Sequence, residues 1–485
     1  MAISFDNIPA NLRTPGAYIE FNNELAGASS IEFKAVVVGQ RLASGTQAEG
    51  VPVRVTDPSQ AISLFGRGSM LALMIAAYLD INSTIELWAI ALDDDDAGQQ
   101  AGTTIAVANP PTAAGTLELY IGGENISVGI ASGDDANTVA ASINAAINAD
   151  LDLPVTATVA TNTVTVTARH KGEVFNDLDI RTSYYDESMP AGLALTIGTM
   201  AGGTSNPDIT AALDAMGDEW FNWLITPYTN TANLVALETE LDDRWGPLRQ
   251  IGCRAWTAYA GTLSVAGTFG SGRNCPHVTC LATGSSPTPV YIAAAINAAV
   301  GVASLSIDPA RPLQTLELTG FLAPARESVW TRAERNIALY DGLSTFTVDK
   351  DGTCRIERQI TMYQTNASGI SDASYLDICT PETLERIRYK QRQMISQQYP
   401  RHKLADDGTN YGAGQAVVTP KIIRGELLAL YREMENSGWV EDYATYDTNL
   451  IVERDTDDSN RLNWRDTPNL VNQARVFAGK QQFIV

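Results

Sequence analysis

Residues that could perform chemistry are few in this chain of 485 residues. It contains only three histidines and five cysteines. The stretch CPHVTC groups Cys275, His277 and Cys280, but this spacing is irregular for a zinc site, and a fourth ligand would have to be Cys253. If HVTCLATG is a β-strand, His277 and Cys280 point to opposite faces of it, because side chains alternate along a strand. We therefore interpret the cysteines as free core thiols, and the sequence predicts no metal site.

Signals for nucleotide binding, calcium binding and hydrolysis are equally weak. The stretch GTFGSGRN (267–274) lacks the Lys-Ser/Thr ending that would contact phosphates and a metal ion, so it predicts a flexible loop. The acidic runs at 93–96 and 456–460 lack the spacing of an EF-hand, and we interpret the first of them as a solvated hinge. No G-x-S-x-G motif is present. We therefore expect no catalytic residue and no cofactor.

The charge of the chain excludes two further classes of binding protein. Its 56 acidic and 33 basic side chains give a formal net charge of −23, whereas proteins that bind nucleic acid or anionic membranes need an excess of Lys and Arg. One segment, ERIRYKQRQMISQQYPRHK, is basic against this background. It is either the solvated face of a helix or a surface that docks on an acidic partner. The candidate contacts on this helix are Arg386, Arg388, Lys390 and Arg392.

The order of apolar runs and turn signals predicts an α/β core with a mainly parallel or mixed sheet and helices. A Thr- and Gly-rich stretch with hairpin signals at Gly122-Gly123 and Thr161-Asn162 interrupts this core and predicts an inserted α+β, β-rich outer domain. Extended arms complete the chain at both ends. The predicted parts are an N-terminal arm (1–30), a first part of the core (31–95), the outer domain (96–206), the rest of the core (207–462) and a C-terminal arm strand (463–485).

Both chain ends indicate association with another chain. Pro9 and Pro15 keep the residues before them out of a helix, so the first segment stays extended. The chain stops on the apolar run QQFIV, which would leave a strand edge unprotected at Val485. Such an edge recruits other chains, and proteins usually cover it. We expect that recruiting another chain is its purpose here.

The residues at the two ends resemble those of Mu-like contractile-phage tail sheath proteins, and the order of parts matches as well. At the start the resemblance rests on Ile8, Pro9, Arg13, Pro15, Tyr18, Ile19 and Glu20. At the end it rests on Leu470, Val471, Asn472, Gln473, Arg475, Val476, Gln482 and Phe483.

This resemblance implies a structural protein of the virion tail, assembled in the bacterial cytoplasm, that forms a helical polymer of itself around the tail tube. Subunits would exchange arms, and the polymer would contract to drive the tube through the host envelope for genome ejection. The other partners implied are baseplate and tail terminator proteins, with no nucleic acid and no membrane. The implied arm contacts are Ile8, Pro9, Arg13, Pro15, Tyr18, Ile19, Arg475, Val476, Phe477, Gln482, Phe483, Ile484 and Val485. The basic helix would face the tube.

Three alternatives fit the same residues less well. The chain could be the sheath of a phage-derived bacteriocin or of a secretion machine, whose subunits would polymerise and contract in the same way. It could be a decoration protein that binds a receptor or a glycan through the inserted domain. An enzyme built on the α/β core would need a pocket with titratable groups, for which the sequence gives poor support.

Overall fold

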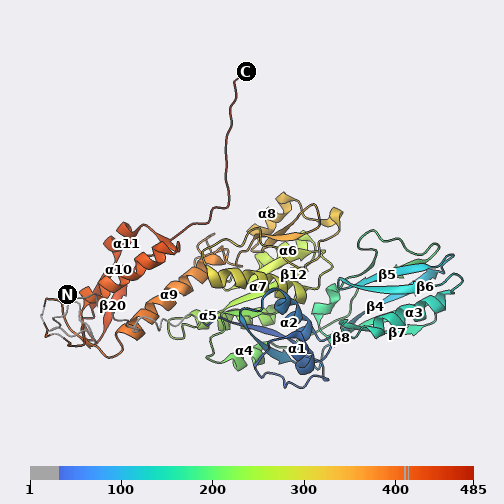
Figure 1. Ribbon diagram of the computed structural model, residues 1–485, viewed down its shortest axis with the longest axis horizontal. Coiled ribbons are helices and arrows are strands. Elements are labelled where there is room, and N and C mark those ends of the chain that lie inside the picture. Colours follow the sequence, from blue (N-terminus) through green and yellow to red (C-terminus); the bar gives the residue numbers. More distant parts are fainter. Residues whose placement is uncertain (1–31, 409–410, 413, 485) are drawn as a thin grey trace, which may run out of the picture. The chain divides into compact units, whose positions relative to one another are not determined.

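A six-stranded sheet organises the chain from Lys34 onward in the computed structural model, which describes residues 32–408, 411–412 and 414–484 (Figure 1). Its strand order is β13-β12-β11-β1-β3-β2, and all pairs are parallel except the edge pair of β2 with β3. Nearly every residue of the central strands is buried, as expected for a parallel sheet covered on both faces. The strands are β1 (Lys34–Gln40), β2 (Val53–Arg54), β3 (Glu86–Leu92), β11 (Trp223–Ile225), β12 (Arg254–Ala260) and β13 (Val278–Gly284).

The helix α7 (Val290–Ile307) packs against β12 and against α2 (Met70–Ile81). It is long and apolar enough to cross a membrane, but most of its surface is buried inside the fold, as in the core helix of a globular domain. Asp57 caps the first helix, since its carboxylate accepts a hydrogen bond from the N–H of Gln60 at 3.0 Å. The other helices around the sheet are α1 (Pro58–Phe65), α4 (Thr210–Met216), α5 (Thr231–Trp245), α6 (Leu263–Ser271) and α8 (Arg332–Tyr340).

Two antiparallel sheets and one helix lie between β3 and α4 in the sequence. The sheets have the orders β10-β4-β8-β7 and β6-β5-β9, and α3 (Ala136–Ala149) packs on β6 and β7. Both predicted hairpin turns are present, with positive φ at Gly122, Gly123 and Thr161. The strands are β4 (Gln100–Asn109), β5 (Gly115–Ile121), β6 (Glu124–Ile130), β7 (Val155–Ala160), β8 (Thr163–Lys171), β9 (Ile180–Thr182) and β10 (Ala194–Ile197).

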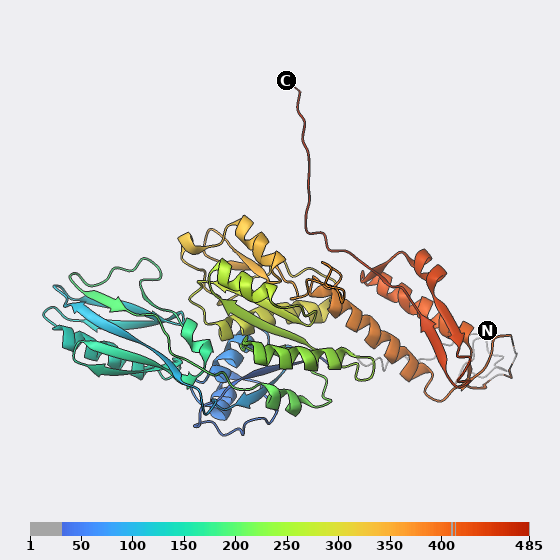
Figure 2. The same ribbon diagram turned by 180° about the vertical axis from the view of Figure 1, so that it is seen from behind.

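The last third of the chain builds a second, smaller hydrophobic core. The long helix α9 (Cys379–Gln398) contributes Ile387 and Met394 to it, and α10 (Pro420–Asn436) contributes half of the other buried residues. Figure 2 shows the hairpin of β19 and β20 beside α10, and the two elements are in contact. The other elements are the hairpin β14 (Thr345–Val348) and β15 (Cys354–Arg358), β16 (Lys403–Leu404), β17 (Val417–Val418), β18 (Val440–Glu441), α11 (Tyr443–Asn449), β19 (Ile451–Arg454), β20 (Leu462–Arg465) and β21 (Asn469–Leu470).

The predicted mixture of helices and sheets is confirmed, but the stretch GTFGSGRN was interpreted wrongly as a flexible loop. Residues up to Ser271 belong to α6, which Thr262 caps through a hydrogen bond from Val265 N–H. A Cβ on Gly270 would lie 2.2 Å from the carbonyl oxygen of Asp341, and one on Gly267 would lie 2.6 Å from its carboxylate. These glycines therefore serve the close approach of the chain after α8, not flexibility.

Candidate functional site

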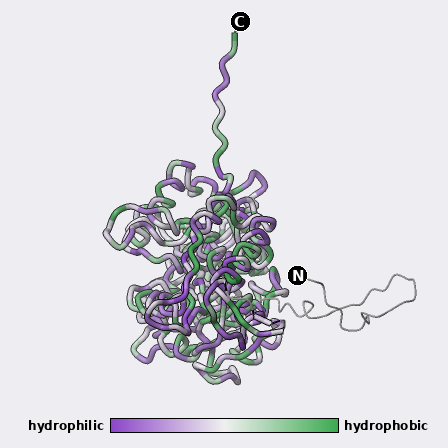
Figure 3. Tube along the Cα trace, turned by 90° about the vertical axis from the view of Figure 1, so that its left-hand side faces the viewer, coloured by the Kyte–Doolittle hydropathy of each residue, from purple (hydrophilic) through white to green (hydrophobic). Residues whose placement is uncertain are grey.

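The end of the chain carries exposed apolar side chains and no secondary structure. Residues 471–484 contain no helix or strand, and Figure 1 shows them as a single extended segment. Val476, Phe477, Phe483 and Ile484 are 84%, 87%, 85% and 100% exposed. Figure 3 shows hydrophobic and hydrophilic stretches following one another along this segment. We call residues 476–484 the free arm. The large apolar side chains of the free arm remain in contact with water over most of their surface, so their burial against another surface would be favourable.

The residues just before the free arm are attached to the rest of the chain, and we call residues 469–475 the arm root. Within the root, β21 pairs with β18, and the N–H of Val471 donates to the carbonyl of Trp439 at 3.1 Å. The side-chain amide of Gln473 donates to the carbonyl of Ala310 at 3.3 Å. The guanidinium of Arg475 lies 2.9 Å from the carboxylate of Asp377. The sequence prediction that Arg475 contacts a neighbouring subunit stays a prediction, while Val476, Phe477, Gln482, Phe483 and Ile484 are all exposed.

The hairpin of β19 and β20 offers a place where another strand could pair. Within the described residues it forms a two-stranded sheet of its own, so the outer edges of both strands have no strand partner there. Ile451 and Trp464 on these strands are exposed apolar side chains. Val452 and Leu462 pack instead against the smaller core, which fixes the hairpin in place. A fixed hairpin with open edges is a template for adding a strand.

The N-terminal residues of the predicted arm site lie outside the described residues, as does Val485. These residues are Ile8, Pro9, Arg13, Pro15, Tyr18 and Ile19.

Three of the four candidate tube-facing side chains on α9 make contacts within the chain, and two of these three, Arg386 and Arg388, are half-buried. Arg386 donates to the carbonyls of Leu305 and Ser306, both at 3.3 Å, and its guanidinium carbon lies 5.8 Å from the ring centroid of Trp439. Its burial lowers the pKa of Arg386. Arg388 pairs with Glu385 and donates to the carbonyl of Trp245 at 2.6 Å. These two arginines hold α9 against the rest of the fold.

The other two candidates differ in exposure. Lys390 is half-buried, as are Arg386 and Arg388, whereas Arg392 is exposed and donates to the carbonyl of Gln250 at 2.6 Å. Sequence reasoning treated all four as one basic face, because a helical repeat cannot show which side chains a distant segment will use.

A buried polar cluster lies where α9 meets α5. Arg254 and Arg388 place their guanidinium carbons 4.5 and 4.3 Å from the ring centroid of Trp245. His277 packs on the same ring and lies 3.3 Å from the carboxylate of Asp242. Burial lowers the pKa of His277 to about 4, and the charges of Arg254 and Arg388 act in the same direction. His277 is therefore a neutral part of the core at neutral pH.

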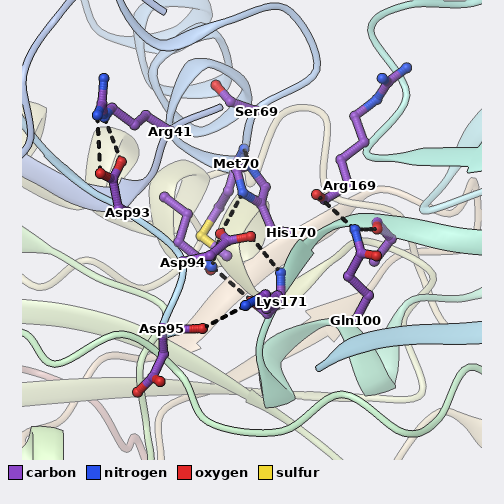
Figure 4. Close-up of polar contacts among 12 residues, drawn as sticks. Arg41, Ser69, Met70, Asp93, Asp94, Asp95, Gln100, Arg169, His170 and Lys171 are labelled. Carbon is purple, nitrogen blue, oxygen red and sulfur yellow. Dashed lines mark hydrogen bonds and ion pairs between the residues drawn. The ribbon is translucent and has the colours of Figure 1, made fainter. Parts of the chain in front are cut away.

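A second polar cluster joins the antiparallel sheets to the six-stranded sheet, and Figure 4 shows His170 lying between Asp94 and Met70. The N–H of Met70 donates to Nε2 of His170 at 3.1 Å, so the ring carries its proton on Nδ1, which lies 2.9 Å from the Asp94 carboxylate. Asp94 also accepts from Gln40 at 2.6 Å and from the Lys171 N–H at 2.9 Å. Burial alone would raise the pKa of Asp94, but these hydrogen bonds and the neighbouring histidine hold it below its usual value. The prediction that the run 93–96 is a solvated hinge is therefore wrong at Asp94, which is hydrogen-bonded to Gln40, His170 and Lys171.

No reactive group stands out in the part of the chain that the structure describes. All five cysteines are buried and free, and burial raises the pKa of Cys253 and of Cys275 to about 12. Within these same residues no group of three or more His, Cys, Asp or Glu side chains is arranged to hold a metal ion.

The described residues thus combine an exposed apolar segment, an anchored root and a hairpin with open edges, and these are surfaces for association and not a reactive centre. Residues 202–362 match the family model for the phage tail sheath protein central domain, and residues 371–484 match that for the phage tail sheath C-terminal domain. The chain is 46% identical over 488 residues to the Mu-like prophage FluMu tail sheath protein of Haemophilus influenzae, with 100% of both chains covered. The chain therefore belongs to the phage tail sheath family, in agreement with the resemblance seen at its two ends.

Two solved structures of sheath proteins are also similar in their chain trace. A sheath tail protein from Desulfitobacterium hafniense is 13% identical, with a TM-score of 0.48 over 94% of this chain and 100% of that chain. The sheath complex of an extracellular contractile injection system in its contracted state is 11% identical, with a TM-score of 0.48 over 98% of this chain and 99% of that chain.

Proposed function

We propose that this tail sheath protein polymerises helically around the tail tube by inserting its free arm into a second copy. The observation that carries the proposal is the free arm itself, whose apolar side chains are 84–100% exposed. A soluble protein gains free energy by covering such side chains, at roughly 25 cal/mol per Å² of apolar surface. The receiving surface is the open hairpin of β19 and β20, which offers unpaired backbone groups beside Ile451 and Trp464.

The spacing of apolar residues in the free arm suits strand addition. Side chains two residues apart point to the same face of a strand, so Phe477 and Phe483 would share one face. Val476, Gln482 and Ile484 would share the other. In strand addition, main-chain hydrogen bonds supply affinity and the alternating side chains supply specificity. The two phenylalanines would therefore pack on the neighbour.

A contact between an arm of one copy and a hairpin of the next is head-to-tail, and it generates an open helix when the rotation does not close. Contraction is then a rigid-body rearrangement of subunits whose arms remain paired, so that the polymer shortens without falling apart. Contraction of the polymer would drive the tube through the host envelope for genome ejection. The partners proposed are the tube, the baseplate and the tail terminator, with assembly in the bacterial cytoplasm.

We also propose that α9 faces the tube, through Lys390 and Arg392 in particular. Arg392 is exposed, whereas Arg386 and Arg388 are half-buried and contact Leu305, Ser306 and Trp245. Residues 96–206, with their two antiparallel sheets, would form the outer domain on the core of 31–95 and 207–462.

The arm proposal is tested by deleting residues 476–485 and recording electron micrographs of the purified protein. We expect a folded monomer with an unchanged melting temperature and no tubular polymers, because the deleted side chains that the structure describes are exposed. Replacing Phe477 and Phe483 by Ser should have the same effect. The matched control replaces Ala478 and Lys480, on the other face, by Ser and should polymerise. Normal polymers from the deleted chain would overturn the proposal.

A further inference from the structure

The boundary between the arm root and the free arm is abrupt, and it falls on one ion pair. Arg475 is 12% exposed, whereas the next residue, Val476, is 84% exposed. The Arg475 guanidinium reaches Asp377, which precedes α9, and also donates to the side chain of Gln473. Beyond Arg475, the described residues of the chain are all exposed.

One carboxylate serves two guanidinium groups at this position. Arg358, at the end of β15, donates to both oxygens of Asp377 at 3.0 Å, and Arg475 lies 2.9 Å from one of them. Nε and Nη1 of Arg475 are buried and have no partner within the described residues. Asp377 is thus the anion that compensates the buried Arg475, and without it two like charges would face each other.

We propose that Arg475 and Asp377 form a clasp that fixes where the arm leaves its own subunit, so that exchange with a second copy begins at Val476. This inference rests on the proposed function of the free arm. Arg475 is then a positioning residue, and the contact that it makes is with its own chain.

The clasp would set the reach of the arm. The ten residues from Val476 to Val485 can span about 33 Å when extended at about 3.3 Å per residue. Releasing the root back to Val471 would add five residues and roughly 16 Å. A longer flexible connection lowers the effective concentration of the arm at its site and permits it to reach wrong neighbours. A fixed exit point therefore selects one neighbour and one register.

Limited trypsin digestion of the monomeric full-length chain tests the clasp. Trypsin must take an Arg or Lys side chain into its own pocket, so Arg475 should be protected while the exposed Lys480 is cut. Mass spectrometry separates the two products, since cleavage after Lys480 releases residues 481–485 and cleavage after Arg475 releases 476–485. If trypsin cuts the wild-type protein after Arg475 as fast as after Lys480, the proposal is overturned, and no variant is needed to show it.

Two variants separate the clasp from a general loss of stability. Asp377→Asn keeps the shape of the side chain but removes the anion, and cleavage after Arg475 should become about tenfold faster or more, because cleavage follows the open population. Arg358→Met breaks an ion pair at the same place but leaves Arg475 and Asp377 paired, so Arg475 should stay protected. Equal acceleration in both variants would overturn the clasp.

Electron microscopy of the same proteins distinguishes this proposal from that of the free arm. Asp377→Asn should give fewer and less regular polymers than wild type. The separate variant Arg475→Lys, which keeps the charge, should give more polymers than Asp377→Asn but fewer than wild type. If deletion of residues 476–485 leaves polymers intact, the proposed function fails, whatever the rate of tryptic cleavage after Arg475. If that deletion abolishes polymers but wild-type Arg475 is open to trypsin, only the clasp fails.

Discussion

The guanidinium carbon of Arg388 lies 4.3 Å from the ring centroid of Trp245, the last residue of α5. The same side chain donates to the backbone carbonyl of Trp245 at 2.6 Å and pairs with Glu385, which is buried. A residue that would look on a helical wheel like part of a solvated or tube-binding face thus joins α9 to the core. This contact is therefore one of those that hold α9 against the core.

Replacing Arg388 by Ala should destabilise the protein by about 2–4 kcal/mol, because it removes the contact with Trp245 and leaves the buried Glu385 without its cation. Arg388→Lys should recover only part of this loss, since a lysine cannot reproduce the planar, forked geometry. Urea unfolding of the purified chain measures both. The control Arg392→Ala, at an exposed position of the same helix, should change the free energy of unfolding by at most about 0.5 kcal/mol. An equal loss in both alanine variants would contradict this role of Arg388.

Charge reversal at Lys390 and Arg392 should impair assembly on tail tubes and leave the subunit folded. The chain is strongly acidic, so these two cations are a local exception that an acidic partner could recognise. The measurement is the fraction of tubes that acquire a sheath in electron micrographs after mixing with Lys390→Glu/Arg392→Glu protein. Lys421→Glu, a reversal at an exposed position on α10, serves as the control and should assemble normally. Extended sheaths of normal length from the double variant would exclude α9 as the tube-facing surface.

The pH dependence of stability should carry the signature of His277. Burial lowers its pKa in the folded protein to about 4, compared with 6.5 for an ordinary histidine, so between these values the unfolded chain binds a proton that the folded chain does not. The free energy of unfolding should therefore fall as the pH drops from 6.5 to 4, with a slope of at most about 1.4 kcal/mol per pH unit from this residue. Below about pH 4 both states are protonated and this residue causes no further loss.

Chemical denaturation of wild type and His277→Gln at half-unit steps from pH 4 to 7.5 measures this term as the difference in slope. The comparison isolates the contribution of this residue, because the two proteins differ at no other position. Parallel curves for the two proteins would show that His277 takes up its proton in the folded state as readily as in the unfolded chain.

Local sequence signals predicted local structure well. Hairpin turns are predicted at Gly122-Gly123 and at Thr161-Asn162, and both are present, with positive φ at Gly122, Gly123 and Thr161. Each of these depends on backbone conformations of a few adjacent residues, which side-chain chemistry restricts directly.

Contacts between distant segments could not be predicted in the same way. Arg475 pairs with Asp377, nearly a hundred residues earlier, and His170 accepts from the N–H of Met70, one hundred residues earlier. No periodicity or composition specifies which segments a fold will bring together. The exposed apolar end, by contrast, could be predicted, because a terminal apolar run without a turn or a cap has nothing nearby in sequence to cover it.

A single methyl group should be enough to disturb the main core at Gly301. A Cβ at this position of α7 would lie 2.2 Å from the ring of Trp256, a fully buried side chain of β12. The alanine would gain up to about 1 kcal/mol of helix propensity, but the buried ring is rigid and cannot move aside, and overpacking costs about 1–3 kcal/mol. A 2.2 Å contact is a severe overlap, which places the cost at the upper end of this range, so Gly301→Ala should destabilise the protein by a net of about 1–2 kcal/mol. The matched control is Gly425→Ala in α10, where a Cβ meets nothing within 4 Å, and it should stabilise by up to about 1 kcal/mol. Thermal and urea unfolding of the two variants should give opposite signs, and a stabilised Gly301→Ala protein would show that α7 and β12 have room to separate.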